Sequence, residues 1–226
     1  MLGTGLLGAF GSRLHRRIHA MQFALRRKRG IEDFPKRLHL GCGIRRAPGF
    51  CNVDITPQPA VDVIDDVARL TRFPRNYAEM IYASHVLEHF SHTEAIAVLE
   101  RWYDVLAPGG ELRVSVPDID RIVQIYMRNW SHFQTDGHAP WIGLIYGGQT
   151  DAHDFHKTGF NFCWMRHLMT KIGYCDISEY PHQPHFIPNF EDGSLAQGSF
   201  GEFISLNVRA TKPMVGTGTP AAPRPM

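Results

Sequence analysis

The sequence has few cysteines, no long apolar run and almost no net charge. Its four cysteines, Cys42, Cys51, Cys163 and Cys175, form neither a C-x-x-C pair nor a regular framework, so we expect reduced thiols in a cytoplasmic protein. No stretch of about 18 apolar residues occurs, so the sequence predicts no membrane-spanning helix. The chain has 226 residues, 43% of them hydrophobic and 20% charged, as expected for one globular domain with extensions.

Acidic residues are missing from the first thirty positions. Residues 1–30 hold seven Arg and Lys and no Asp or Glu, so the rest of the chain carries −5 against a total of +2. An acidic globular part argues against nucleic acid as a partner. Within residues 12–29, apolar side chains recur at helical spacing, at Leu14, Ile18, Met21 and Leu25. We expect either a cationic amphipathic helix that contacts a partner or anionic lipid at the inner membrane face, or a solvated extension.

Strand and helix patterns alternate along the rest of the chain. Strands are expected at residues 38–41, 52–54, 80–84, 111–116, 174–180 and 203–210, and helices at 94–106, 120–129 and 162–172. Pro108-Gly109-Gly110 is expected to end the first of these helices, and residues 130–160 to form a long functional loop. This alternation predicts a mostly parallel sheet with helices on both faces and a ligand at the carboxyl ends of its strands.

These patterns divide the chain into three parts. Residues 1–34 form the basic extension, 35–212 the folded domain, and 213–226 a tail rich in Pro and Gly that is expected to be disordered. No feature of the sequence specifies the oligomeric state.

The most informative motif is Leu38–Gly43, which reads LHLGCG, followed by Asp54 eleven residues after Gly43. An apolar strand that leads into a glycine turn allows a ligand to approach the backbone closely. A carboxylate at the end of the next strand can accept hydrogen bonds from two ribose hydroxyls. The pattern predicts a site for a nucleoside cofactor, although the glycines could also serve only a tight turn, and Asp54 and Asp66 could be ordinary strand-end and cap residues.

Five further segments occur with this motif: Asn52–Asp54 (NVD), Asp66–Leu70 (DVARL), His85–His89 (HVLEH), Val105–Leu112 (VLAPGGEL) and Val116–Asp118 (VPD). In their order and spacing, residues 38–212 resemble a class I S-adenosylmethionine-dependent methyltransferase of the small bacterial type with an LGCG cofactor loop. The resemblance implies S-adenosylmethionine as cofactor. It also implies a Rossmann-like three-layer α/β sandwich, with a seven-stranded, mostly parallel sheet whose last strand is antiparallel.

The resemblance also implies a cofactor site, formed by Gly41, Cys42, Gly43, Asp54, Asp66, Val67, Ser84 and His85. The two glycines would line the methionine and ribose portion, and Asp54 would bind the ribose hydroxyls. Asp66 would accept from the adenine amino group beside the backbone of Val67. Ser84 and His85 would lie near the sulfonium, with His89 and Phe90 flanking the pocket. Cys42 itself is expected to be a small buried residue with no neighbouring base.

One departure from the family concerns the connection from Gly43 to Asp54. It is short and contains Pro48-Gly49, so the helix that usually follows the glycine loop must be reduced to a turn or lost. Less helix N-terminus would then face the carboxylate of the cofactor.

Candidate catalytic residues concentrate in residues 150–161. Methyl transfer requires alignment of the acceptor and exclusion of water, and it needs a base only when the acceptor arrives protonated. We expect His153 or His156 to be that base, with Asp118 beside the pocket and Lys157 contacting an anionic group of the substrate. These residues could instead only shape a loop.

Other functions remain open at this point. An NAD site would need Gly or Ala at position 46, where Arg46 stands. HVLEH matches the H-x-x-E-H pattern of a zinc hydrolase, with His85 and His89 as ligands and Glu88 as base. His153-x-x-His156 and His182-x-x-His185 could together hold a metal, but we predict none. The chain could also be a catalytically silent protein that binds the cofactor.

The acceptor is expected to be a small polar molecule, since the domain is acidic and its loop is rich in aromatic residues and histidine. By analogy with the family, a sugar or a surface-polysaccharide precursor is the favoured class.

Overall fold

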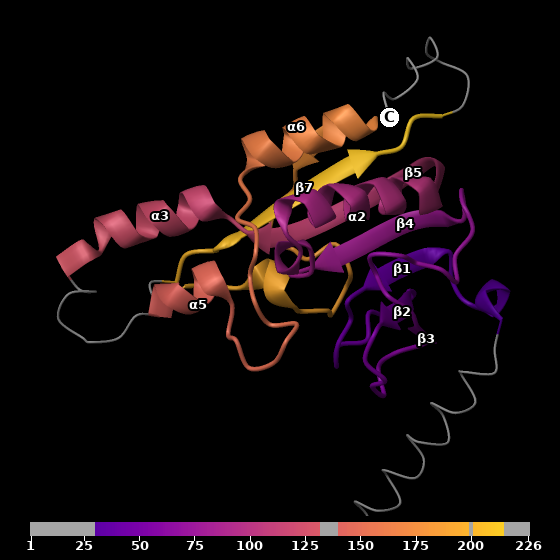
Figure 1. The fold of residues 1–226 in the computed structure, drawn as a ribbon, viewed down its shortest axis with the longest axis horizontal. Coiled ribbons are helices and arrows are strands. Elements are labelled where there is room, and N and C mark those ends of the chain that lie inside the picture. The colour runs from indigo at the N-terminus through magenta and orange to yellow at the C-terminus, as the bar shows by residue number, and fades with distance from the viewer. Residues whose placement is uncertain (1–29, 132–139, 199–200, 215–226) are drawn as a thin grey trace, which may run out of the picture.

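Seven strands pair into one sheet in a computed structural model that describes residues 30–131, 140–198 and 201–214 (Figure 1). The strands are β1 (Arg37–Leu40), β2 (Cys51–Asp54), β3 (Val63–Ile64), β4 (Ala78–Ser84), β5 (Leu106–Pro117), β6 (Cys175–Glu179) and β7 (Ser205–Thr211). Their order is β3-β2-β1-β4-β5-β7-β6. The pairs among β1 to β5 are parallel, and β7 is antiparallel to both of its neighbours. This confirms the predicted mostly parallel sheet with an antiparallel last strand.

Helices complete the fold. They are α2 (His92–Val105), α3 (Ile119–Arg128), α5 (Pro140–Tyr146) and α6 (Phe162–Ile172), with the short 3-10 helices η1 (Ile31–Asp33), η2 (Leu87–His89) and η3 (Gly193–Leu195). Among the described residues, no helix has the length and apolar character needed to cross a membrane. The helix expected at residues 12–29 and most of the tail lie outside the described residues, so the proposed division into three parts stays a prediction.

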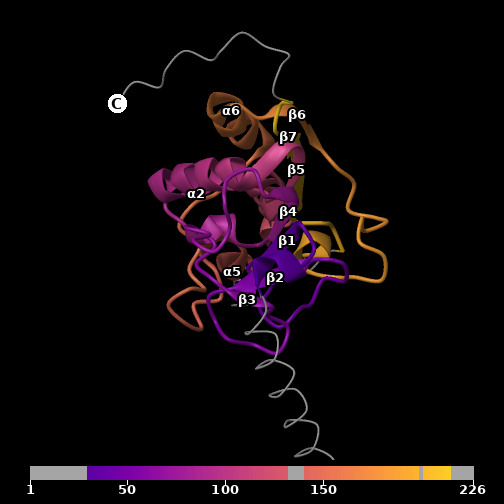
Figure 2. The ribbon, with the colours of Figure 1, turned by 90° about the vertical axis from the view of Figure 1, so that its right-hand side faces the viewer.

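The two long helices α2 and α6 pack on one face of the sheet (Figure 2). A capping box begins α2, in which Ser91 Oγ accepts from the Glu94 N–H and the Glu94 carboxylate accepts from the Ser91 N–H. Its inner stripe includes Trp102, which is fully buried and donates from Nε1 to the Val67 carbonyl at 2.8 Å. This bond fixes the loop after β3 to the helix layer.

The opposite face of the sheet is covered differently. There the irregular segment after Tyr180, which includes η3, lies against the strands (Figure 2). Tyr82 of β4 points to this face and is fully buried in a second apolar cluster with Ala47, Phe50, Ile187 and Phe190. Strand alternation explains the two faces, since the neighbouring Ile81 packs in the larger cluster with α2 and α6.

The expectation that Pro108-Gly109-Gly110 ends the preceding helix was wrong. The helix before Pro108-Gly109-Gly110 ends at Val105, and β5 begins at Leu106, so this tripeptide lies inside the strand. Gly109 has φ +77°, and a Cβ on Gly110 would come within 2.9 Å of the Ala78 carbonyl oxygen. The glycines therefore let β5 start beside β4 immediately after the helix.

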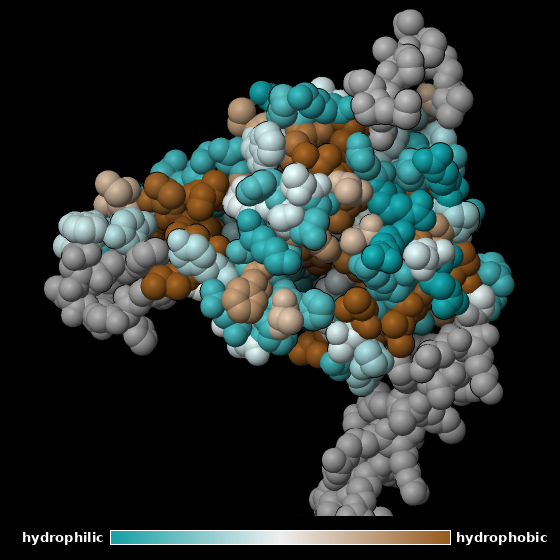
Figure 3. Space-filling model, viewed as in Figure 1, coloured by the Kyte–Doolittle hydropathy of each residue, from teal (hydrophilic) through white to brown (hydrophobic). Residues whose placement is uncertain are grey.

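The expected loop at residues 130–160 is also not entirely irregular, since it contains α5. Apolar side chains of α3 and α5 gather on the surface at the left of Figure 3; those of Val123, Met127 and Ile142 are exposed. A cavity of about 310 Å³ lies between these helices and residues 156–159. The two helices thus form one wall of this cavity.

The two-residue strand β3 was missed in the sequence because its apolar run is too short to show a period.

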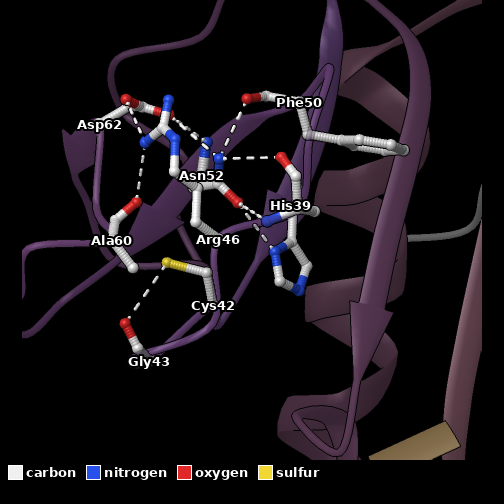
Figure 4. Close-up of polar contacts among 9 residues, drawn as sticks. His39, Cys42, Gly43, Arg46, Phe50, Asn52, Ala60 and Asp62 are labelled. Atoms are coloured by element: carbon white, nitrogen blue, oxygen red, sulfur yellow. Dashed lines mark hydrogen bonds and ion pairs between the residues drawn. The ribbon is translucent and has the colours of Figure 1, made fainter. Parts of the chain in front are cut away.

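No helix follows β1, as predicted; a buried polar cluster organises this connection instead (Figure 4). Asn52 Oδ1 accepts from the Ala47 N–H at 2.8 Å and from His39 Nδ1 at 3.0 Å. Its Nδ2 donates to the Phe50 carbonyl at 3.0 Å and to Asp62 Oδ2 at 3.1 Å. Asp62 in turn binds Arg46 at 2.8 Å. We call these four side chains, His39, Arg46, Asn52 and Asp62, the Asn52 cluster.

Replacement of Asn52 by leucine should destabilise the fold strongly. Asn52→Leu leaves the Ala47 N–H and the Phe50 carbonyl buried without partners, and we expect the free energy of unfolding to fall by about 3 kcal/mol. Urea denaturation measures this loss. Asn129→Leu, at a half-buried amide that ends α3, is the control and should cost less than half as much. Equal losses would contradict the importance of the cluster.

The cluster should also make stability depend on pH. Burial lowers the pKa of His39 below its ordinary value of 6.5, so the unfolded chain binds the proton more readily than the folded one. The contribution of neutral His39 to the free energy of unfolding is therefore fully present above pH 6.5. It should fall as the pH decreases below 6.5, by up to about 1.4 kcal/mol per pH unit. His39→Gln should lack this part of the loss when the two are compared by urea denaturation between pH 5 and 8. Parallel curves for the two proteins would refute it.

Candidate functional site

A cavity of about 390 Å³ lies at the carboxyl ends of β1, β2 and β4. Gly41 follows β1, Asp54 ends β2 and His85 follows β4, and all three line it. This is the edge where parallel α/β sheets bind ligands. Asp66 and Val67, from the loop after β3, line the same cavity. The structure thus brings together five of the eight residues predicted to hold a cofactor.

The glycine loop is held by the backbone and end of β2. The Val53 carbonyl accepts from the N–H groups of Gly41 at 2.9 Å and Cys42 at 3.2 Å. Gly41 has φ +66°, and a Cβ there would overlap the side chain of Val86. The positive φ and the contact with Val86 both favour glycine at this position of the cavity wall.

Asp54 connects the loop to the cavity. Its Oδ2 accepts from the Gly43 N–H and its Oδ1 from the Thr56 N–H, both at 2.8 Å. The two bonds fix the carboxylate, and each oxygen keeps a lone pair for a further donor. A fixed carboxylate with two free acceptor positions is suited to a pair of neighbouring hydroxyls, as in a ribose.

Asp66, which lines the same cavity, is held in a similar way. Its Oδ1 accepts from the Ala68 N–H at 2.9 Å, and Oδ2 lies 3.5 Å from Arg69 Nε. The side chain remains partly exposed, so it can also accept from a ligand amino group. Asp54 and Asp66 are therefore two anchored acceptors in one cavity.

Three predicted cofactor residues do not line the cavity. Gly43 contributes its N–H to Asp54, and Ser84 ends β4 beside Ser115. Cys42 is buried with its Sγ 3.8 Å from the Gly43 carbonyl oxygen, and burial raises the pKa of its thiol well above the ordinary value. Cys42 is thus a small buried residue, as predicted from the sequence.

His85 is held rigidly at the cavity by polar contacts on both ring nitrogens. Nδ1 lies 3.1 Å from Glu88 Oε1, and Nε2 lies 2.9 Å from Ser205 Oγ, which itself donates to the Gly193 carbonyl. Burial lowers the pKa of His85, but the Glu88 carboxylate outweighs this effect, and the pKa lies above 6.5. The ring is thus held in one orientation, on a residue with backbone φ +54°.

The three candidate catalytic residues lie in three different places. His153 lines the first cavity, of about 390 Å³, together with Asp151. His156 lines the second cavity, of about 310 Å³, next to Lys157. Asp118 lines neither: its Oδ1 caps α3 by accepting from the N–H groups of Asp120 and Arg121. The geometry of Asp118 is that of a helix cap.

His89 and Phe90 line the cavity, as the sequence indicated. Ile55 and Thr56, just after Asp54, also line it but were missed. Their position immediately after a strand end was the available signal.

The candidate metal patterns of the sequence do not assemble as expected. In HVLEH, His85 precedes η2 in a left-handed conformation and binds Glu88, so His85 and His89 do not share a helix face as a zinc hydrolase requires. His182 Nε2 instead lies 2.7 Å from the Ser205 carbonyl oxygen. His153 and His156 line separate cavities.

Comparison with known proteins gives a clear family match. A family described as a methyltransferase domain matches residues 22–162. A search of curated proteins finds no match.

Three solved structures are among those to which the chain is similar. A SAM-dependent methyltransferase from Methanosarcina mazei is 12% identical over 78% of this chain and 92% of that chain, with a TM-score of 0.48. One from Archaeoglobus fulgidus is 14% identical over 91% of this chain and 94% of that chain, with a TM-score of 0.45. Human N-acetylserotonin methyltransferase in complex with SAM is 15% identical over 81% of this chain and 49% of that chain, with a TM-score of 0.45.

Asp54 should be the residue whose loss most weakens cofactor binding. Asp54→Ala removes the acceptor for two hydroxyls, and we expect the affinity for S-adenosylmethionine to fall by about 1–3 kcal/mol, roughly 5- to 150-fold. Calorimetry measures the change, with circular dichroism as the folding check. Asp104, on α2, forms an ion pair with Arg75, and the control variant Asp104→Ala should bind S-adenosylmethionine as the wild type does. Equal affinity in Asp54→Ala and Asp104→Ala would remove Asp54 from the site.

Proposed function

The chain belongs to the methyltransferase domain family and is an S-adenosylmethionine-dependent methyltransferase, and from this premise we propose that it methylates a small polar acceptor, with a sugar or a surface-polysaccharide precursor as the favoured class. The observation that carries the proposal is the pair of neighbouring cavities. The first has two anchored carboxylates at the strand ends, and the second is small and lined by Lys157 and Thr158.

The residues of the first cavity fit S-adenosylmethionine by their chemistry. Asp54 would accept from the ribose hydroxyls, and Asp66 from the adenine amino group. Gly41 and Val86 line the same cavity, so the glycine loop borders the space in which the ligand would bind. When bound, S-adenosylmethionine supplies a methyl group activated by a positively charged sulfur. The chain then has to align the acceptor and exclude water.

The second cavity is our candidate for the acceptor. The ring centroids of His89, from the first cavity, and His156, from the second, lie 5.1 Å apart, so the two spaces adjoin. A volume of about 310 Å³ suits a sugar-sized group better than a polymer. Lys157 would bind an anionic group such as a phosphate, and Tyr146 and Thr158 offer hydroxyls. The −5 charge of residues 31–226 also disfavours a nucleic acid.

Of the candidate bases, we assign the role to His153. It lines the cofactor cavity, where the methyl group is expected, whereas His156 lines the second cavity and Asp118 caps a helix. The Asp151 carboxylate accepts from the His153 N–H at 2.7 Å and orders the turn that carries the ring. His153 would remove the proton from an acceptor hydroxyl as the methyl group transfers.

The proposed contact of residues 12–29 with a membrane or a partner stays a prediction.

The acceptor class can be tested directly. Purified protein is incubated with S-adenosylmethionine and panels of nucleotide sugars, free sugars, peptides and RNA, and formation of S-adenosylhomocysteine is measured. We expect turnover with sugars that carry an anionic group. Turnover with peptide or RNA alone would contradict the proposal.

His153→Ala should separate catalysis from cofactor binding. We expect turnover with the identified acceptor to fall by about 10²- to 10⁴-fold, the usual contribution of a base, while affinity for S-adenosylmethionine changes less than twofold. His92→Ala, at the exposed start of α2, should retain full turnover. Unchanged turnover in His153→Ala would exclude this base.

A further inference from the structure

We propose that Glu88, His89 and His156 form a binding site for one divalent transition-metal ion, of the zinc or iron(II) type, at the boundary of the two cavities. One ligand atom of each residue lies within 4.8 Å of the others. Three atoms so spaced all lie within 4.8/√3, about 2.8 Å, of a common point. Bonds from zinc to histidine and carboxylate measure about 2.0–2.2 Å, so a small inward shift of each side chain completes the site.

Both histidines are prepared to act as ligands by their tautomers. His89 Nδ1 lies 3.2 Å from the Phe155 carbonyl oxygen, and His156 Nδ1 lies 3.2 Å from the Leu144 carbonyl oxygen. A carbonyl oxygen only accepts, so Nδ1 carries the proton in each ring and Nε2 keeps its lone pair. Metal-binding histidines are usually oriented in this way by a backbone carbonyl. His156 Nε2 lies 4.0 Å from Glu88 Oε1.

Glu88 supplies the negative charge and an unused oxygen atom. Only 1% of the residue is exposed. Oε1 is 3.1 Å from His85 Nδ1, whereas Oε2 has no hydrogen-bond partner in the described part of the chain. A buried carboxylate oxygen without a donor is costly, and a cation at this position would satisfy it. His85 would then orient the ligand carboxylate from behind.

Backbone contacts bring the three ligands together from distant parts of the sequence. Glu88 and His89 lie on η2, directly after β4. The N–H groups of Lys157 and Thr158 donate to the Glu88 carbonyl at 2.7 and 3.2 Å, so the segment that carries His156 is fixed to η2. Thr158 Oγ1 also donates to the Phe90 carbonyl at 2.7 Å. The cluster is therefore positioned by the fold rather than by chance side-chain rotamers.

The ligand set points to a metal with open coordination positions. Two histidines and one carboxylate are the ligands of catalytic zinc and of non-haem iron(II) sites, which keep positions for water or substrate. His89 lines the cofactor cavity and His156 the second cavity, so an oxygen at an open position would lie between them. There the ion would lower the pKa of an acceptor hydroxyl. This role rests on the proposed function, whereas metal binding itself does not.

Metal binding is tested on the full chain after removal of metals with a chelator. Equilibrium dialysis against zinc should give one tightly bound ion per chain, and cobalt(II) should give visible absorption bands of a site with nitrogen and oxygen ligands. His89→Gln and His156→Gln should each weaken zinc binding at least tenfold. His167→Gln, at an exposed histidine of α6, should leave it unchanged. Glu88→Gln tests the third ligand by the same measurement, provided that circular dichroism shows the variant to be folded. If it is not folded, the two histidine variants alone decide.

The outcomes separate this proposal from the methyltransferase function. Absence of zinc binding, or zinc binding unchanged in both His89→Gln and His156→Gln, would overturn the metal site. S-adenosylmethionine is titrated into the metal-free protein in parallel. Cofactor binding without zinc binding would reject only the metal site, and zinc binding without cofactor binding would reject only the proposed cofactor cavity.

Discussion

The hydrogen bonds of the buried Asn52 amide are the interactions on which the glycine loop after β1 depends. In this fold a helix normally follows the glycine turn, but this chain has only a short connection between β1 and β2. Asn52 replaces the helix by binding the backbone of that connection through Ala47 and Phe50, while His39 and Asp62 hold the amide from either side. The next two residues, Val53 and Asp54, then bind the glycine loop itself. One short strand thus carries both the amide that holds this connection and the carboxylate proposed to bind the ribose.

A second organising point is Glu88 on η2, which joins the end of β4 to the segment of the two candidate histidines. Its carbonyl fixes residues 157 and 158, and its carboxylate holds His85 beside the cofactor cavity. The two cavities are therefore coupled by one residue whose side chain is buried and charged. A charge in this position is costly unless it is paired, which accounts for the histidines gathered around it.

Much of the fold could be predicted because apolar periodicity and glycine turns are local signals. The strands at 38–41 and 52–54, the helix 162–172 and the mostly parallel sheet follow from such signals. Asp54 could be placed because it ends a predicted strand, whereas Asp66 and His85 were expected at the same cavity only from the family resemblance. The Asn52 cluster could not be predicted, because Asn52 pairs with Ala47, Phe50 and Asp62 only after the strands align. The same holds for Glu88 and His156, which are 68 positions apart and meet through backbone bonds of residues with no pattern of their own. Asp118 caps α3 between Pro117 and Ile119, which line the second cavity, so its expected place beside the pocket stays a prediction while its role as a helix cap was not foreseen.

The most direct test of the cofactor site is a calorimetric titration of the purified protein with S-adenosylmethionine and S-adenosylhomocysteine, with NAD as control. The anchored carboxylates Asp54 and Asp66 and the glycine loop at Gly41, which line one cavity, predict saturable binding of one molecule per chain for the first two ligands and none for NAD. Absence of binding for both, or binding of NAD instead, would contradict the assignment of this cavity and of the chemistry built on it.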